Sequence, residues 1–352
     1  MLQKRDIRHW LCVAPALAAA CCALWSCSYI DEDLSDCGTD LDLDYSLSLT
    51  TNIVTELQTE LTTTTEVALG QQLQQQLGNV FRRYAHDVDL SFYTTDSLRA
   101  HHEQHTMNAG EASYTLYLPV NNYHHLALAN IGEESQVDYV DDEQVGTAML
   151  LQHKADTLRP HTAGLFTARN EVNINDTTRH FDVRLYMANC ACALVLRATQ
   201  PELVRGIETY ITGVASAFSL NDSTYHFEHN PIIRTEKLDI AGITDSLFCQ
   251  YTVCFPSRDA TENGQRSARP KDACKARMVN DEGLWQIHCY ITLPDGTVTR
   301  NILNISRALR AGNLNIVKAV VNPDGSLGTT SPLVGVSVTL DWRDGGTYTP
   351  EL

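Results

Sequence analysis

FDVRLYMANCACALVLRA, residues 181–198, is the strongest indication of fold in this sequence. The run carries enough continuous apolar character to cross the middle of a sandwich core as a strand. Because successive side chains of a strand alternate between two faces, Cys190 and Cys192 would lie on the same side. We therefore expect this stretch near the centre of a mainly β fold.

At least five more strands are predicted in the second half of the chain. Asp295-Gly296 and Asp324-Gly325 are predicted hairpin turns between some of them. The segments are ETYITGVASAF (208–218), LFCQYTVCF (247–255), LWQIHCYITL (284–293), LNIVKAVV (314–321) and VGVSVTLDW (334–342).

The first half of the chain combines strand and helix periodicity. From about Thr65 to Tyr84 the apolar residues recur every three or four positions, which predicts an amphipathic helix packed on a sheet. Further strands are expected at residues 88–92, 114–119 and 126–129, and the polar segment 133–160 is expected to be a long surface excursion. Before the helix, apolar and polar residues alternate over nine positions and predict a half-buried strand; its apolar members are Leu41, Leu43, Tyr45, Leu47 and Leu49.

These patterns predict a mainly β protein with two tandem β-sandwich domains and the helix packed on the first. The domains are expected to span residues 41–174 and 175–352. With 352 residues, the chain is long enough to bury two sizeable cores.

The N-terminus has the pattern of a lipoprotein export signal. A basic segment with Lys4, Arg5 and Arg8 precedes an apolar run from Trp10 to Trp25, which is short for a membrane span and suits a signal peptide. Ser26 is a small residue directly before Cys27. We therefore expect residues 1–26 to be removed and the Cys27 thiol to be acylated. The alternatives are an ordinary secretory signal cut near Ala20, an uncleaved anchor, or lipidation of Cys21 in place of Cys27.

The charge of the chain excludes some partners. The formal net charge is −17, and residues 1–26 carry +2 of it, so the mature chain is near −19. A nucleic-acid partner is not expected, because phosphate contacts require basic surface. Residues 27–40 form an acidic tether in which Asp31, Glu32 and Asp33 follow the lipidated cysteine. This run is a solvated linker or, by its similarity to Bacteroidetes lipoproteins, a surface-export signal.

No residue pattern indicates catalysis or a cofactor other than the lipid on Cys27. The chain lacks a GxSxG elbow, a Gly-rich phosphate loop and a DxDxDG calcium loop. The string HHEQH at 101–105 is not the HExxH zinc pattern, and we expect it to be a solvated loop without a metal. Six cysteines of the second half allow 15 disulfide connectivities, among which the sequence does not choose.

Three stretches together resemble the FimB-type fimbrial anchor family of Bacteroidetes. They are the tether CSYIDEDLSDC (27–37), the helix and strand at 69–93, and YTLYLPVNNYHHLALANIGE (114–133). The resemblance implies two transthyretin-like β-sandwiches and no enzymatic activity. It also implies an outer-membrane location at the base of a fimbria, with a stalk subunit as partner and a role in limiting fimbrial length.

The resemblance also suggests a function for the first strand. Stalk subunits of this system polymerise by β-strand addition after trimming at an Arg or Lys, which opens an acceptor groove. This chain has no Arg or Lys between Cys27 and Val80. We therefore expect the strand from Leu41 to Leu49 to stay attached and to fill its own groove.

Two other functions remain open at this point. A surface glycan-binding lipoprotein would also be a tandem β-sandwich, but such modules use exposed aromatic platforms. Only Trp285 and Trp342 remain in the mature chain, and both lie in strand patterns that suggest core positions. A lipid-tethered hydrolase has no local motif in its favour.

Overall fold

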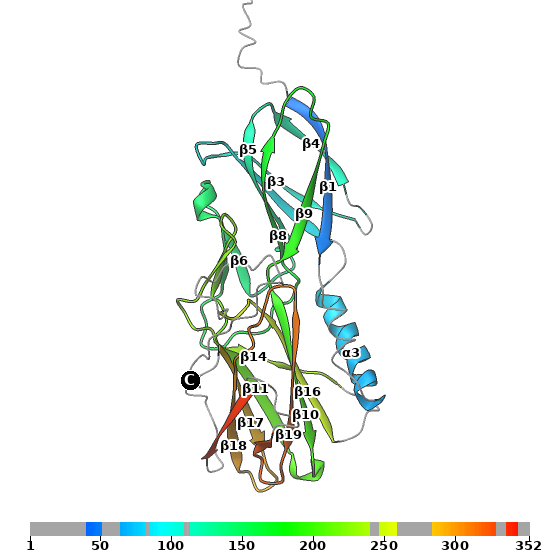
Figure 1. Ribbon diagram of the computed structural model, residues 1–352, viewed down its shortest axis with the longest axis vertical. Helices are drawn as coiled ribbons and strands as arrows, with labels where there is room; N and C mark the ends of the chain where they lie inside the picture. The colour runs from blue at the N-terminus through cyan, green and yellow to red at the C-terminus, as the bar shows by residue number, and fades with distance from the viewer. Residues whose placement is uncertain are drawn as a thin grey trace, which may run out of the picture. The chain divides into compact units, whose positions relative to one another are not determined.

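The computed structural model describes residues 40–50, 64–81, 85–108, 111, 113–239, 246–258, 284–328 and 336–343. Four sheets and one α-helix make up the described chain (Figure 1). Residues Leu41–Leu352 form one compact unit. The division into domains at residues 174 and 175 stays a prediction.

The first sheet has seven strands in the order β3-β2-β5-β8-β9-β1-β4. Neighbouring strands β2, β3, β5, β8 and β9 pair antiparallel, whereas β1 runs parallel to β9. The strands are β1 (Asp40–Thr50), β2 (Asp87–Tyr93), β3 (Arg99–Thr106), β4 (Ser113–Pro119), β5 (Asn122–Ala129), β8 (Phe166–Asn173) and β9 (His180–Met187).

Two five-stranded sheets face each other across a second core and form a sandwich. Leu194 and Leu196 of one sheet share a buried cluster with Trp285, Ile287 and Leu303 of the other. One sheet contains β15 (Glu236–Lys237), β16 (Leu247–Cys254), β10 (Cys190–Ala198), β19 (Leu314–Val321) and β20 (Leu327–Gly328), in that order. The other contains β14 (Ile233–Arg234), β11 (Gly206–Thr212), β17 (Trp285–Thr292), β18 (Val298–Ile305) and β21 (Val336–Arg343).

A four-stranded sheet and two short 3-10 helices complete the described fold. The sheet order is β13 (Thr224–His226), β12 (Ala217–Ser219), β7 (Met149–Gln152) and β6 (Val137–Val140). The 3-10 helices are η2 (Val145–Thr147) and η3 (Pro201–Leu203). The expectation of a surface excursion at 133–160 is therefore wrong, because β6 and β7 lie there and Leu150 is fully buried.

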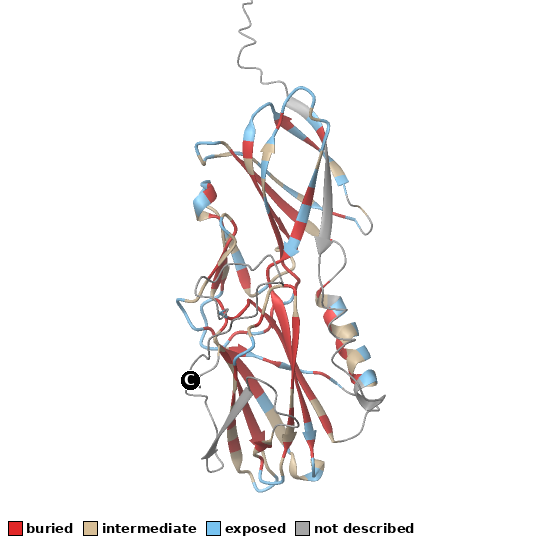
Figure 2. Cartoon of the chain, viewed as in Figure 1, coloured by how far each residue is buried: buried red, intermediate tan, exposed pale blue. Residues whose placement is uncertain are grey.

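The mainly β fold and the apolar run at its centre are confirmed. Residues 190–196 of β10 are all buried, so both faces of the strand are covered (Figure 2). Cys190, Cys192, Leu194 and Leu196 face the sandwich core, while Ala191, Ala193 and Val195 belong to the cluster on the opposite face. The run 181–198 nevertheless forms two strands, because β9 joins the seven-stranded sheet and β10 joins the sandwich.

The helix α3 (Thr64–Val80) covers the outer face of β10 and its neighbours. Leu69, Leu73 and Leu77 are buried at intervals of four residues, and the side-chain amide of Gln76 donates to the Tyr251 hydroxyl of β16 at 2.9 Å. The predicted helix is confirmed. Its buried leucines share one cluster with the seven-stranded sheet and with β10, β16 and β19 of the second half, so the helix does not pack on the first half alone. The small side chains of Ala191 and Ala193 leave room for the leucine stripe.

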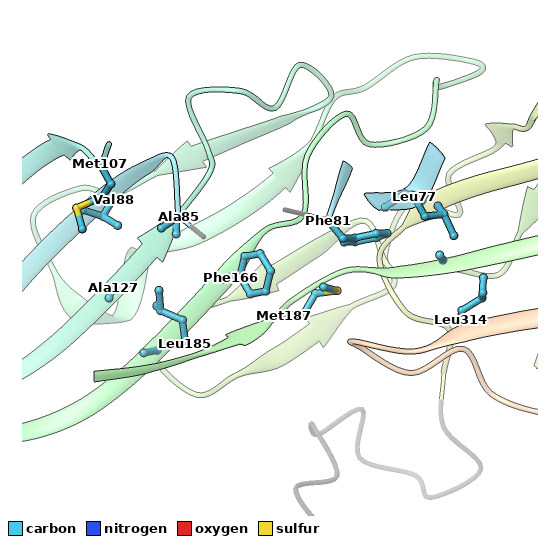
Figure 3. Packing of buried hydrophobic residues seen from close by; sticks show 14 of the residues in the cluster. Leu77, Phe81, Ala85, Val88, Met107, Ala127, Phe166, Leu185, Met187 and Leu314 are labelled. Carbon is cyan, nitrogen blue, oxygen red and sulfur yellow. The ribbon is translucent and has the colours of Figure 1, made fainter. Parts of the chain in front are cut away.

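A single buried cluster continues from the seven-stranded sheet to this helix. Figure 3 shows it from Val88 and Ala127, through Phe166 and Met187, to Leu314 of β19. Burial of this continuous apolar surface is the main favourable contribution to folding of these elements.

His125 is a fully buried histidine in the core of the seven-stranded sheet. Its ring stacks on Phe92 with centroids 4.1 Å apart, and its Nδ1 donates to the Ser91 carbonyl at 3.1 Å. Burial lowers the pKa of His125 to about 3 and that of His288 to about 4, while the pKa of buried His161 is also lowered. These rings are therefore neutral in the folded protein at neutral pH.

The free energy of unfolding is expected to decrease as the pH falls from about 6.5 to about 4. The unfolded chain takes up protons on these histidines near the ordinary pKa, whereas the folded chain does not until the lowered pKa is reached. The neutral rings of His125 and His288 each lower the free energy of unfolding by about 1.4 kcal/mol per pH unit within this window. Urea unfolding at several pH values measures the slope.

His125→Phe is expected to flatten this slope by about one proton, because one of the groups is removed. His229→Phe, at an exposed position of the same residue type, is the matched control. Equal slopes for His125→Phe and the parent protein would contradict the assignment.

Candidate strand-insertion site

Strand β1 lies inside the seven-stranded sheet, between β9 and β4. Its backbone is in register with β9 over seven residues, with Tyr45 beside Phe181, Leu47 beside Val183 and Leu49 beside Leu185. Among the described side chains of the strand, Leu43 is 0% exposed and its neighbour Asp42 is exposed. The side chains of Leu41, Tyr45, Leu47 and Leu49 lie outside the described residues.

The two strands beside β1 turn apolar residues into the same core. Val183 and Leu185 of β9 and Leu116 and Leu118 of β4 are buried in one cluster with Leu43. Alternate residues of both strands are exposed, as expected for strands with one face in the core. The buried side chains of β9, β1 and β4 thus form one continuous apolar face of the sheet.

β4 reaches the sheet only through β1 in the described strand order. Without β1, the facing edges of β9 and β4 would both expose backbone donors and acceptors. Such open edges invite pairing with another strand. The geometry is therefore that of a groove between two strands, filled by the first strand of the same chain.

The other predicted site residues lie outside the described residues. These are the lipidation site Cys27 with the preceding Ser26, and the acidic residues Asp31, Glu32 and Asp33. In the described part of the chain, no helix is long and apolar enough to cross a membrane. Trp285 is buried, as the strand pattern predicts, and its indole donates to the Arg307 carbonyl at 2.7 Å.

The histidine-rich string 101–105 forms the edge strand β3, so the expectation of a solvated loop is wrong. Pairing with β2 fixes it, and His102 Nε2 lies 2.9 Å from the carboxylate of buried Asp89, which also accepts from Gln104 at 2.8 Å. No group of three or more potential metal-ligating His, Cys, Asp or Glu residues occurs among the residues described. The polar contacts of this strand hold it to the sheet.

A cavity of about 1280 Å³ lies beside β7, β12 and β13. Its lining combines apolar residues such as Leu151 and Ile232 with His153, His226 and Glu228, and contains no Trp, Tyr or Phe. An aromatic platform for stacking on sugars is therefore missing at this cavity. This cavity therefore provides no support for the alternative of a glycan-binding function.

Residues 47–233, more than half of the chain, match the model of a known family. The match begins within β1 and ends at β14, so it covers the whole seven-stranded sheet except the first residues of β1. That family consists of structural proteins of fimbriae, not of known enzymes.

The chain belongs to the family described as fimbrillin-A associated anchor proteins Mfa1 and Mfa2. The resemblance drawn from the sequence is thereby confirmed, and with it an association with fimbriae at the cell surface.

Solved structures of similar proteins are distant from this chain. The fimbrial anchor protein Mfa2 from Porphyromonas gingivalis is 7% identical, with a TM-score of 0.46, 87% of this chain covered and 100% of that one. A fimbrial assembly protein from Parabacteroides distasonis is 12% identical, with a TM-score of 0.39, 86% of this chain covered and 99% of that one. No curated protein matches the sequence.

Replacing Leu43 with alanine is expected to lower the free energy of unfolding of the mature chain by about 2–5 kcal/mol, because it leaves a cavity in the core under β1. Asp42→Ala, at the adjacent exposed position, is the matched control and should stay within about 0.5 kcal/mol of the parent. Denaturant unfolding measures both. Equal effects would mean that β1 does not belong to the folded core.

Proposed function

We propose that this protein is the lipid-tethered base of a fimbria and that it ends the filament at the membrane. The observation that carries the proposal is the position of β1 between β9 and β4. A subunit whose own first strand occupies this groove offers no place there for a strand of another subunit. Growth can then proceed only from a different surface.

The sequence around β1 supports a strand that stays in place. Stalk subunits, as the family resemblance implies, lose their first strand by cleavage at an Arg or Lys. Residues 28–80 contain neither, so a protease of that specificity has no site before or directly after β1. The groove therefore remains filled after export.

The N-terminal tether supplies the membrane attachment in this proposal. A single acyl chain holds a protein to a bilayer only marginally, whereas two or more chains give stable attachment. A bacterial lipoprotein cysteine carries a diacylglyceryl group, and Cys27 is the residue in position to receive it. The acidic residues Asp31, Glu32 and Asp33 would direct the lipoprotein to the outer face of the outer membrane.

The partner is a fimbrial stalk subunit, held by β-strand complementation at a surface other than the groove that β1 fills. In such pairing the backbone hydrogen bonds supply affinity, and the alternate side chains supply specificity. Because β1 fills the groove, no further subunit can be added there. The protein therefore caps the filament and limits its elongation.

Cys27→Ala is expected to release fimbriae into the medium, because the filament loses its lipid attachment. The ratio of fimbrial antigen on cells to that in the medium, compared with the parent strain, measures this. Ser28→Ala, one residue further along, is the control and should leave the ratio unchanged. Release of the variant protein alone, with fimbriae still on the cells, would contradict the anchoring role.

The mature protein in assembled fimbriae is expected to begin at acylated Cys27 and to retain β1. Mass spectrometry of the N-terminal peptide checks this, with a stalk subunit from the same preparation as the trimmed control. A form cut between Asp44 and Thr65 would contradict the capping mechanism, while the lipid attachment would be tested separately by Cys27→Ala.

A further inference from the structure

The five cysteines of the second half that the structure describes are fully buried, and their thiols are free. Four of them lie on two neighbouring inner strands of one sheet, Cys190 and Cys192 on β10 and Cys249 and Cys254 on β16. Cys190, Cys192 and Cys254 face the sandwich core, whereas Cys249 lies in the cluster on the opposite face.

Cys190 and Cys254 stand directly opposite each other across the β10–β16 pair. The Sγ atom of Cys190 donates to the Cys254 carbonyl at 3.4 Å, so this thiol already lies against its cross-strand neighbour. Directly opposed residues of antiparallel strands have Cα atoms about 4.5–5.5 Å apart, which falls within the roughly 4.4–6.8 Å that a disulfide spans.

The remaining described cysteines lack such a partner. Cys192 is opposite Thr252, which makes Cys254 its diagonal neighbour, and diagonal positions are separated by about 7–8 Å. Cys249 is opposite Val195, and Cys289 lies on β17 of the facing sheet, where its cross-strand neighbours are Thr209 and Asn301. Strand register therefore singles out one pair.

We propose that Cys190 and Cys254 form a disulfide bond in the exported protein. The bond forms by exchange with a disulfide of a protein oxidant. One cysteine thiolate attacks the oxidant and forms a mixed disulfide, and the second thiolate then displaces the oxidant as a dithiol. The two protons lost by the cysteine thiols are matched by the two that protonate the departing thiolates of the oxidant. Two electrons pass from the cysteines to the oxidant, so the exchange balances.

The bond must form before the strands are enclosed. Both sulfur atoms are inaccessible in the folded chain, and burial raises the pKa of the Cys190 thiol well above its ordinary value, which suppresses the reactive thiolate. Exchange therefore takes place while β10 and β16 are pairing. The inference uses the proposed function only in requiring export to an oxidising compartment.

The cross-link would join two neighbouring inner strands, β10 and β16, and close a loop between positions 64 residues apart. The loop contains β11–β15, so the bond restricts a large part of the unfolded chain and disfavours unfolding. Both cysteines belong to the sheet on which α3 lies, and the bond is separate from β1 and its groove.

The test begins with protein isolated from cells, denatured without reductant and treated with N-ethylmaleimide before digestion and mass spectrometry. The expected result is a Cys190 peptide joined to a Cys254 peptide, lighter than the separate peptides by two hydrogen atoms, with Cys249 and Cys289 alkylated. Alkylation of both Cys190 and Cys254, or a bond from either to another cysteine, overturns the inference. The same chain without residues 1–26, kept in the cytoplasm, should show all these thiols alkylated.

Unfolding measurements give an independent readout. Reduction in denaturant and refolding with reductant is expected to lower the melting temperature by on the order of 10 °C. Cys190→Ala and Cys254→Ala should each abolish this reductant-dependent shift, whereas Cys249→Ala, on the opposite face, should retain it. A shift that survives in both alanine variants overturns the inference. The Cys27→Ala experiment tests the anchor proposal and does not depend on Cys190 or Cys254. A failure of the anchor proposal can therefore be distinguished from a failure of the disulfide inference.

Discussion

Strand β10 has no solvent-facing side from Cys190 to Leu196, and the arrangement of the other elements depends on this double burial. One face needs a second sheet, and β11, β17 and β18 supply it. The other face needs a different cover, because its alanines are too small to fill a core against another sheet. The leucine stripe of α3 provides that cover, which is why a helix from the first half lies on strands of the second.

The chain passes from the seven-stranded sheet to the sandwich at a single buried polar residue. Asn189 accepts from the Leu165 amide at 3.2 Å and donates to the Ala163 carbonyl at 2.8 Å. Its own carbonyl accepts from Gly312 at 2.9 Å. Since an unpaired amide at this depth would be costly, these bonds fix the geometry of the crossing and hold three segments together.

The sequence predicts those elements in which local periodicity and burial agree. The alternation at 41–49, the helical spacing of Leu69, Leu73 and Leu77, and the apolar run 190–196 each indicate the element that the structure contains. The place of β1 in the sheet could not be derived in this way. Its parallel pairing with β9 joins residues more than 100 positions apart, and no local pattern records such a partner.

Two of the predictions from sequence are wrong for the same physical reason. β3 is polar on both faces, so neither hydrophobic periodicity nor turn residues distinguish it from a loop; its pairing with β2 makes it a strand. The run 181–198 contains no Gly or Pro at the point where it changes sheets, and Asn189 marks the crossing only through contacts with distant segments. Tertiary partners decide both cases, and a single sequence does not show them.

In the proposed role at the base of a fimbria, the pairing of β1 has a mechanical consequence. A force applied to the N-terminal end of β1 along its axis acts across the ladders to β9 and β4 in shear, so many hydrogen bonds must fail together. A hairpin pulled from its open end would instead unzip one bond at a time. The strand is thus paired in the geometry that best resists extraction, and tension along it spreads over both neighbouring strands.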